Sequence, residues 1–254
     1  MTIRFSSTQV PNRGTNFMFG VGDRSTGAFI PGVGGALDAP MTALGGTLAL
    51  FGAVAARNGT EYAIDKIPAY NRLAVVSTGL ANAARDVRVA ALHEMQTIAS
   101  AWANLTAVDP TSIATMNIRA HALALLGAAP DVGNKVRLLQ GFGEEQLAGV
   151  IESGGLDGLP PEIVEQAKAR YSVLRAVRIS GIQGDFPKRP SVDDVLANGP
   201  DVDAAENAAR AKIDEIKVRS KVAEAVARVL NETITVVELT CDLQRQDAYV
   251  LVMG

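Results

Sequence analysis

The sequence predicts a mainly α-helical protein: a helical bundle with one long amphipathic helix and a small β element formed by the N- and C-terminal segments. Three observations predict this class. Alanine, which has the highest helix propensity, is frequent, aromatic residues make up only 5% of the chain, and apolar residues recur every three or four positions. With 254 residues, of which 48% are hydrophobic, the chain is long enough to bury a sizeable core.

Residues 1–35 are expected to form an extended, Gly-rich arm with one or two short strands. Ile3 and Phe5 alternate with polar neighbours, and a second apolar run contains Phe17 and Phe19. Glycines and prolines interrupt the segment repeatedly, which is typical of strands joined by turns. We expect the arm to pack either on its own domain or on a neighbouring subunit.

A helical region is expected over residues 36–152, and it begins with an unusual segment. Residues 39–56 contain no charged side chain, and Leu44, Leu48 and Phe51 share one helical face. A helix over 41–56 would be about 24 Å long, whereas a bilayer core is about 30 Å thick. The segment is therefore either a buried core helix or a helix that inserts into a membrane or packs against another subunit. Its adjacent glycines, Gly45 and Gly46, could also break it in two.

The long amphipathic helix is expected at about 69–107. Apolar residues recur there at spacings of three or four, from Leu73 through Val87 to Leu105, and Gly79 is the only residue that threatens continuity. Unbroken, this helix would be roughly 58 Å long.

The last region, 153–254, follows a Gly-rich loop and is expected to be helical with a β tail. A charged helix should run from Asp203 to about Asn231. The runs Thr233–Val237 and Tyr249–Val252 are rich in β-branched and aromatic residues, which favour strands. The alternative for the first run is that it simply extends the helix.

No linear motif in the sequence predicts a catalytic, metal or cofactor site. His93-Glu94 lacks the second histidine that a zinc motif needs four residues later, where Thr97 stands, and His121 is remote. Cys241 lies beside Asp242, whose charge disfavours a thiolate. A single cysteine also excludes an internal disulfide.

Glycine-rich and charged segments have simpler interpretations than ligand binding. The glycines of 20–27 lack the Lys-Ser/Thr that a phosphate-binding loop requires. The acidic pairs Glu144-Glu145 and Asp193-Asp194 are expected near helix starts, where they complement the helix dipole. The net charge of −3 gives no specific nucleic-acid signal, and the sequence does not identify a small-molecule ligand.

The leading hypothesis from the sequence is a non-enzymatic structural subunit of a large homo-oligomeric assembly, such as a virion, tail or secretion-type component. The N-terminal residues carry no signal peptide pattern, so the expected location is the cytoplasm or an assembled particle. An arm or edge strand would add to a neighbouring subunit. The expected subunit contacts are Ile3, Phe5, Phe17, Phe19, Tyr249, Val250 and Val252.

The sequence leaves two alternatives open. One is a helical membrane-inserting or pore-forming protein that uses segment 39–56, with Leu44, Leu48, Leu50 and Phe51 as the inserting residues. The other is an enzyme whose site is assembled only in the fold, where a linear motif would not reveal it.

Overall fold

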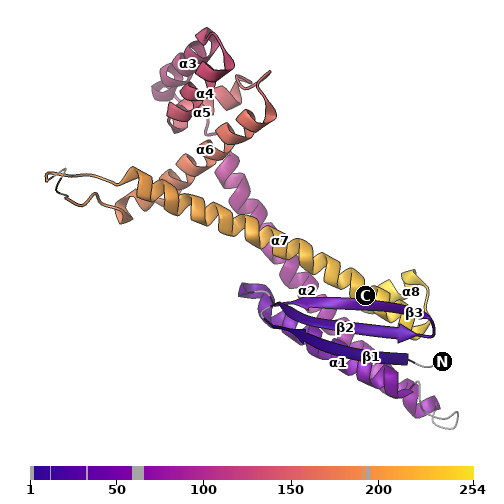
Figure 1. Cartoon of the computed structure of the whole chain (residues 1–254). Coiled ribbons are helices and arrows are strands. Elements are labelled where there is room, and N and C mark those ends of the chain that lie inside the picture. The colour runs from indigo at the N-terminus through magenta and orange to yellow at the C-terminus, as the bar shows by residue number, and fades with distance from the viewer. Residues whose placement is uncertain (1–2, 12, 33, 59–65, 191, 193–194) are drawn as a thin grey trace. The chain divides into compact units, whose positions relative to one another are not determined.

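The computed structural model describes residues 3–11, 13–32, 34–58, 66–190, 192 and 195–254 (Figure 1). The predicted mainly α fold with a small β element is confirmed, with the sheet at the N-terminus. Packing divides the chain into two units. Unit 1 comprises Met1–Ile98 and Arg219–Gly254, and unit 2 comprises Ala99–Val218. Both boundaries fall within long helices, at positions that carry no Gly or Pro signal.

The N-terminal segment forms a three-stranded antiparallel sheet in unit 1, with the order β1-β2-β3. The strands are β1 (Ile3–Val10), β2 (Gly14–Val21) and β3 (Arg24–Pro31). Phe5 pairs with Phe19, and Phe17 pairs with Ala28. Because side chains alternate along a strand, the aromatic residues of β1 and β2 lie on one face of the sheet.

Helix α1 (Asp38–Asn58) covers that face, as Figure 1 shows. Its apolar stripe packs into the core with the sheet, and Leu44, Leu48 and Phe51 are completely buried there. The helix runs without interruption through Gly45 and Gly46. Packing along one entire face compensates for the low helix propensity of the two glycines.

Three further helices contribute to unit 1. They are α2 (Lys66–Thr106), α7 (Val202–Cys241) and α8 (Arg245–Met253). The long amphipathic helix predicted at 69–107 corresponds to α2. Its buried residues, including Leu80, Ala84 and Val87, share the core with residues of α1 and α7.

The expected β contribution from the C-terminal segment is wrong, because both runs are helical. Thr233–Val237 continues α7, which was the alternative, and Tyr249–Val252 lies in α8. No glycine or proline interrupts residues 201–241. Burial of Ile234, Val236 and Val237 against the sheet and α1 outweighs the strand preference of β-branched residues. The hydroxyl of Thr233 is satisfied inside the core, since it donates to the carbonyl oxygen of Val229.

The helices of unit 2 that belong to it entirely follow the end of α2 and precede the start of α7 in the sequence. They are α3 (Ile113–Ala128), α4 (Val132–Gly141), α5 (Glu144–Glu152), α6 (Pro161–Ser180) and the 3-10 helix η3 (Ile182–Asp185). Ser112 caps α3 and Asp131 caps α4, each by accepting a backbone N–H. Glu144 and Glu145 lie in the first turn of α5 as predicted, whereas Asp193 and Asp194 lie outside the described residues.

Candidate functional site

The aromatic residues expected to contact another subunit pack together inside unit 1. Phe17 and Phe19 are buried, and Phe5 is half-buried beside them. The ring centroids of Phe5 and Phe19 are 5.0 Å apart, and those of Phe19 and Phe51 are 6.4 Å apart. These side chains hold the sheet on α1. Ile3, which is half-buried, is therefore joined to a strand that is already fixed within its own unit.

The C-terminal contact residues divide between the core and the surface. Val252 is buried, while Tyr249 and Val250, just before it in α8, are 44% and 55% exposed. Helix α8 is anchored by Ala248 and Val252, which lie four residues apart on its inner face. The surface of α8 thus presents Tyr249 and Val250 to solvent on a helix rather than on a strand.

Three of the four residues considered for membrane insertion face the core. Leu44, Leu48 and Phe51 pack against the sheet, whereas Leu50 is exposed on the other face of α1. Residues 35–57 are long and apolar enough to span a membrane, with a third of the most apolar window buried. Core helices of soluble proteins have the same length and composition.

Strand β1 forms one of the two outer edges of the sheet. Within the described part of the chain, strand β1 has a strand neighbour on one side only. In an antiparallel ladder, the residues of one strand alternate in the side to which their main-chain groups point. The N–H of Phe29 on β3 points away from β2, and Phe29 is paired through Asn16 of β2 with Thr8 of β1. The main-chain groups of Thr8 therefore point toward β2. Those of the alternate residues Ile3, Phe5, Ser7 and Gln9 point away from β2. We call these groups the β1 edge.

The opposite edge of the sheet is covered at its centre. The backbone N–H of Phe29 on β3 donates to Oε2 of Glu232 on α7, at 3.0 Å. A side chain that satisfies an outward N–H blocks the addition of another strand at that position. The two edges of the sheet are therefore not equivalent, and the β1 edge is the one that can accept a further strand.

Helix α3 exposes a second uncharged surface, in unit 2. Between Ser112 and Pro130 the only charged residue is Arg119, and its side chain is buried. Most exposed side chains of the helix are apolar, with Asn117 and His121 as polar exceptions, and Ile113 is 90% exposed. We call this surface the α3 face, which consists of Ile113, Met116, Ile118, Ala120, Ala124 and Leu125. Large exposed apolar patches are typical of interaction surfaces.

Arg119 fixes α3 from its buried side. Its guanidinium donates to Oε2 of Glu145 at 2.9 and 3.1 Å, to Oε2 of Glu152 at 2.7 Å, and to the carbonyl oxygen of Asp109 at 2.9 Å. Burial opposes its charge, but the hydrogen bonds and charges of Glu145 and Glu152 outweigh burial and raise the pKa of Arg119. The result is a fixed cation that joins α3 to α5.

A second ion-pair cluster holds the segment between α2 and α3. Asp109 accepts hydrogen bonds from Arg175 and Arg178 of α6, and Arg178 also pairs with Glu144. The hydrogen bond from Arg175 holds the pKa of Asp109 below its usual range; partial burial opposes this effect and Arg178 reinforces it. Because these carboxylates are paired with permanent cations, the cluster is suited to holding a loop rather than to transferring protons.

The side chains considered for chemistry do not converge. His93 and His121 are both exposed, on α2 and α3 respectively, and Cys241 is half-buried at the end of α7. Burial raises the pKa of the Cys241 thiol to about 11, which keeps it protonated at neutral pH. Among the described residues, no group of three or more His, Cys, Asp or Glu side chains could hold a metal ion.

Linear motifs identified neither the β1 edge nor the α3 face, for different reasons. Ser7 and Gln9 carry no chemical signature, since the β1 edge consists of main-chain atoms whose direction depends on strand order. The α3 face did leave a signal, namely nineteen residues from Ser112 to Pro130 with a single charge.

No family model, curated protein sequence or solved structure matches this chain.

Proposed function

We propose that the protein is a non-enzymatic structural subunit of a homo-oligomeric assembly, and that a second copy adds to its β1 edge. The observation that carries this proposal is an eight-residue edge strand, β1, which among the described residues has a strand on only one side. Unpaired main-chain N–H and C=O groups in a row are a template for strand addition.

The side chains of β1 favour pairing with an identical strand. Residues 6–9 are Ser-Ser-Thr-Gln, which carry no charge that would repel a second copy. The strand's charged residue, Arg4, is turned to its own sheet, because its guanidinium donates to the carbonyl oxygen of Gly22 at 3.0 Å. Natural edge strands commonly resist pairing through lysine, proline or a bulge, and β1 has neither of those residue types between Ile3 and Val10.

Growth beyond a pair of subunits requires a second, different surface. A two-fold contact through the β1 edge closes on itself and gives a dimer. The α3 face belongs to unit 2 and supplies an independent apolar contact, while the exposed Tyr249 and Val250 supply another in unit 1. Two non-equivalent surfaces on each copy support a larger assembly of the kind found in virions, tails and secretion systems.

The experiment measures the solution mass of the full chain by light scattering over a hundredfold concentration range. The wild type should give a defined multiple of 26.6 kDa. Ser7→Pro removes an outward N–H without removing a hydrogen bond to β2, so it should reduce the mass while the thermal unfolding midpoint changes little. Ser7→Ala keeps the N–H and should retain the wild-type mass.

A wild type that stays monomeric at every concentration would overturn the proposal. A Ser7→Pro variant that folds and keeps the wild-type mass would reject the β1 edge as the contact. Ile118→Glu tests the α3 face separately: it should stop growth at a small oligomer, and Glu215→Gln, a charge change on the exposed surface of α7, should not.

The second candidate function is membrane insertion through α1. Its support is the apolar, partly exposed segment 35–57, in which residues 39–56 carry no charged side chain. Insertion would require Leu44, Leu48 and Phe51 to leave the sheet, since they are completely buried against it. Leakage of dye-loaded liposomes that is abolished by Leu50→Asp, which changes an exposed residue of α1, would favour this function over assembly.

A further inference from the structure

A groove in unit 2 has the size of a small-molecule site. It lies between α6, the first half of α7 and the C-terminal end of α2, and its volume is about 740 Å³. Pockets that bind drug-sized ligands typically have volumes of about 300–1,000 Å³. The lining includes one aromatic side chain, Trp102, and the four cationic side chains Lys168, Arg170, Arg210 and Lys217.

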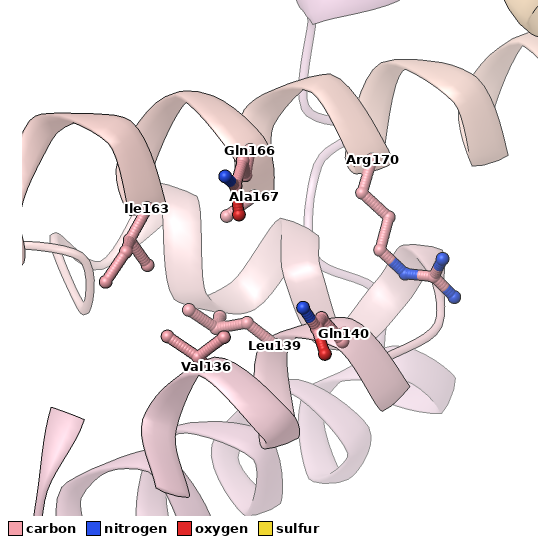
Figure 2. Close-up of a pocket in the computed structure, with 7 residues that line it drawn as sticks. All are labelled: Val136, Leu139, Gln140, Ile163, Gln166, Ala167 and Arg170. Carbon is pink, nitrogen blue, oxygen red and sulfur yellow. The ribbon is translucent and has the colours of Figure 1, made fainter. Parts of the chain in front are cut away.

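The groove adjoins a much smaller hollow between α4 and α6. Figure 2 shows this hollow, in which side chains of the two helices face each other across a volume of about 30 Å³, enough for about one water molecule. Gln140, Gln166 and Arg170 line both the hollow and the groove. Amide and guanidinium groups therefore line the groove next to the α4–α6 contact.

The charge of the groove is opposite to that of the unit that contains it. Residues 99–218 contain 12 Lys and Arg against 16 Asp and Glu. The groove lining has four cations, Lys168, Arg170, Arg210 and Lys217, and two anions, Glu165 and Asp214. A local excess of positive charge in an acidic unit favours an anionic ligand.

Two of the cations share one carboxylate oxygen. Oε2 of Glu206 lies 3.2 Å from Nη2 of Arg210 and 3.9 Å from Nη1 of Arg170. Lys168 and Lys217 each have a carboxylate of their own, Glu165 and Asp214. The pair Arg170–Arg210 thus has one positive charge in excess. Each guanidinium has five N–H donors, of which Nε of Arg170 donates to the carbonyl oxygen of Phe142, while Nη1 and Nη2 of Arg210 donate to Asn207 and Glu206. The other donors can bind a further oxyanion.

An aromatic ring and an apolar floor accompany these charges. Trp102 of α2 is 39% exposed and lines the groove, and the floor contains the buried side chains of Val173 and Ile213. Exposed indole rings bind flat apolar groups by stacking. The groove therefore combines a ring-binding surface with a cationic surface.

We infer that this groove binds a small planar aromatic molecule that carries a phosphate group. The ring packs beside Trp102 over Val173 and Ile213, and the phosphate is held by Arg170 and Arg210. Nucleoside monophosphates have this chemistry and fit the volume. The inference concerns unit 2 alone and does not depend on the proposed assembly.

Trp102 is the only tryptophan of the chain, so its fluorescence reports directly on the groove. The probe is adenosine 5′-monophosphate, with adenosine and inorganic phosphate as separate arms, and calorimetry gives the affinity independently. The monophosphate should change the Trp102 emission with a saturable dependence, and both separate arms should bind at least about tenfold more weakly.

Arg210→Gln should weaken binding of the monophosphate by about tenfold, which is the usual effect of removing a charge-assisted hydrogen bond. Lys212→Gln is the matched control, since it makes the same charge change two residues away on α7 and does not line the groove. No saturable signal with the monophosphate would overturn the inference. Equal binding of adenosine would reject the phosphate contact, equal binding of phosphate would reject the ring contact, and equal losses in the two variants would reject the groove.

Discussion

The ring of Phe5 on β1 lies directly against the backbone of Gly52 on α1. A Cβ atom at position 52 would be 2.3 Å from Cδ2 of Phe5 and 2.7 Å from its Cγ. Such distances are far shorter than van der Waals contact, so the absence of a side chain at Gly52 is what lets strand and helix approach each other here. The strand that carries the proposed assembly edge is seated on α1 through this contact.

Gly52→Ala should therefore destabilise the protein although alanine is the better helix former. The expected loss is about 1–3 kcal/mol, because the Phe5 ring must move. The matched control is Gly46→Ala in the same helix, where a Cβ meets no atom within 4 Å. That control should stabilise by up to about 1 kcal/mol. Urea unfolding measures both, and equal effects of the two substitutions would refute the close contact.

The contact between α3 and α5 should show the same dependence on a missing side chain. A Cβ at Gly149 of α5 would lie 2.6 Å from Cβ and 2.8 Å from Cα of Arg119. Backbone cannot move aside as a flexible side chain can, so Gly149→Ala should cost about 1–3 kcal/mol in the free energy of unfolding. Gly127→Ala in α3, where a Cβ has no neighbour within 4 Å, is the control and should not destabilise. Chemical denaturation followed by circular dichroism measures the free energy of unfolding of both variants. An unchanged value for Gly149→Ala would contradict the close contact between α3 and α5.

Acid should weaken both units through two carboxylates. Arg219 donates a hydrogen bond that holds the pKa of Glu94 below 4.5, and Arg175 does the same for Asp109 below 3.8. A carboxylate with a depressed pKa stabilises the fold fully above its unfolded-state pKa. That stability is lost as the pH falls through the folded-state value. The free energy of unfolding should thus be constant from pH 7 to about 5 and fall below pH 4.5.

Asp109→Asn tests the share of Asp109 in this acid dependence. The variant should be less stable than the wild type at pH 7, and the difference should shrink as the pH falls through the lowered pKa of Asp109, where the wild-type carboxylate also becomes neutral. Glu215→Gln makes an equal change in net charge at an exposed position of α7 and should leave the profile unchanged. A constant difference between Asp109→Asn and wild type at all pH values would show that the ion pairs do not contribute.

Cys241 should react slowly in the folded protein. Burial raises its pKa to about 11, compared with an ordinary value of 9.0. At pH 8 the thiolate fraction is then about a hundredfold smaller, and the rate of reaction with a thiol reagent should fall accordingly. Absorbance with a chromogenic disulfide reagent measures the rate, and the same reaction in urea is the control. Equal rates in the two conditions would mean that the thiol is not shielded.

The helical regions could be predicted from the sequence because their signals are local. The stripe of α2 repeats every three or four residues and needs no knowledge of the partner to be recognised. The N-terminal alternation around Phe5 and Phe17 likewise predicted strands. The alternation did not show what these side chains would pack against. Phe17 and Phe19 lie in the core of their own unit, so their apolar area is already buried within the chain.

The C-terminal segment shows where local preference fails. Thr233, Ile234, Val236 and Val237 prefer strands as isolated residues, yet they continue α7. Burial of a whole helical face against α1 and the sheet contributes more than the small difference in propensity between strand and helix.

The sequence by itself determined the mainly helical class, the long amphipathic helix and the lack of a recognisable linear motif for catalysis or metal binding. Only the tertiary structure decided which surfaces are open. The β1 edge depends on strand order, the ion pairs of Arg119 join residues 26 and 33 positions apart, and the groove combines Trp102 with Arg170 and Arg210. Such sites depend on distances in space between residues that are remote in the chain, and a local sequence pattern does not predict those distances.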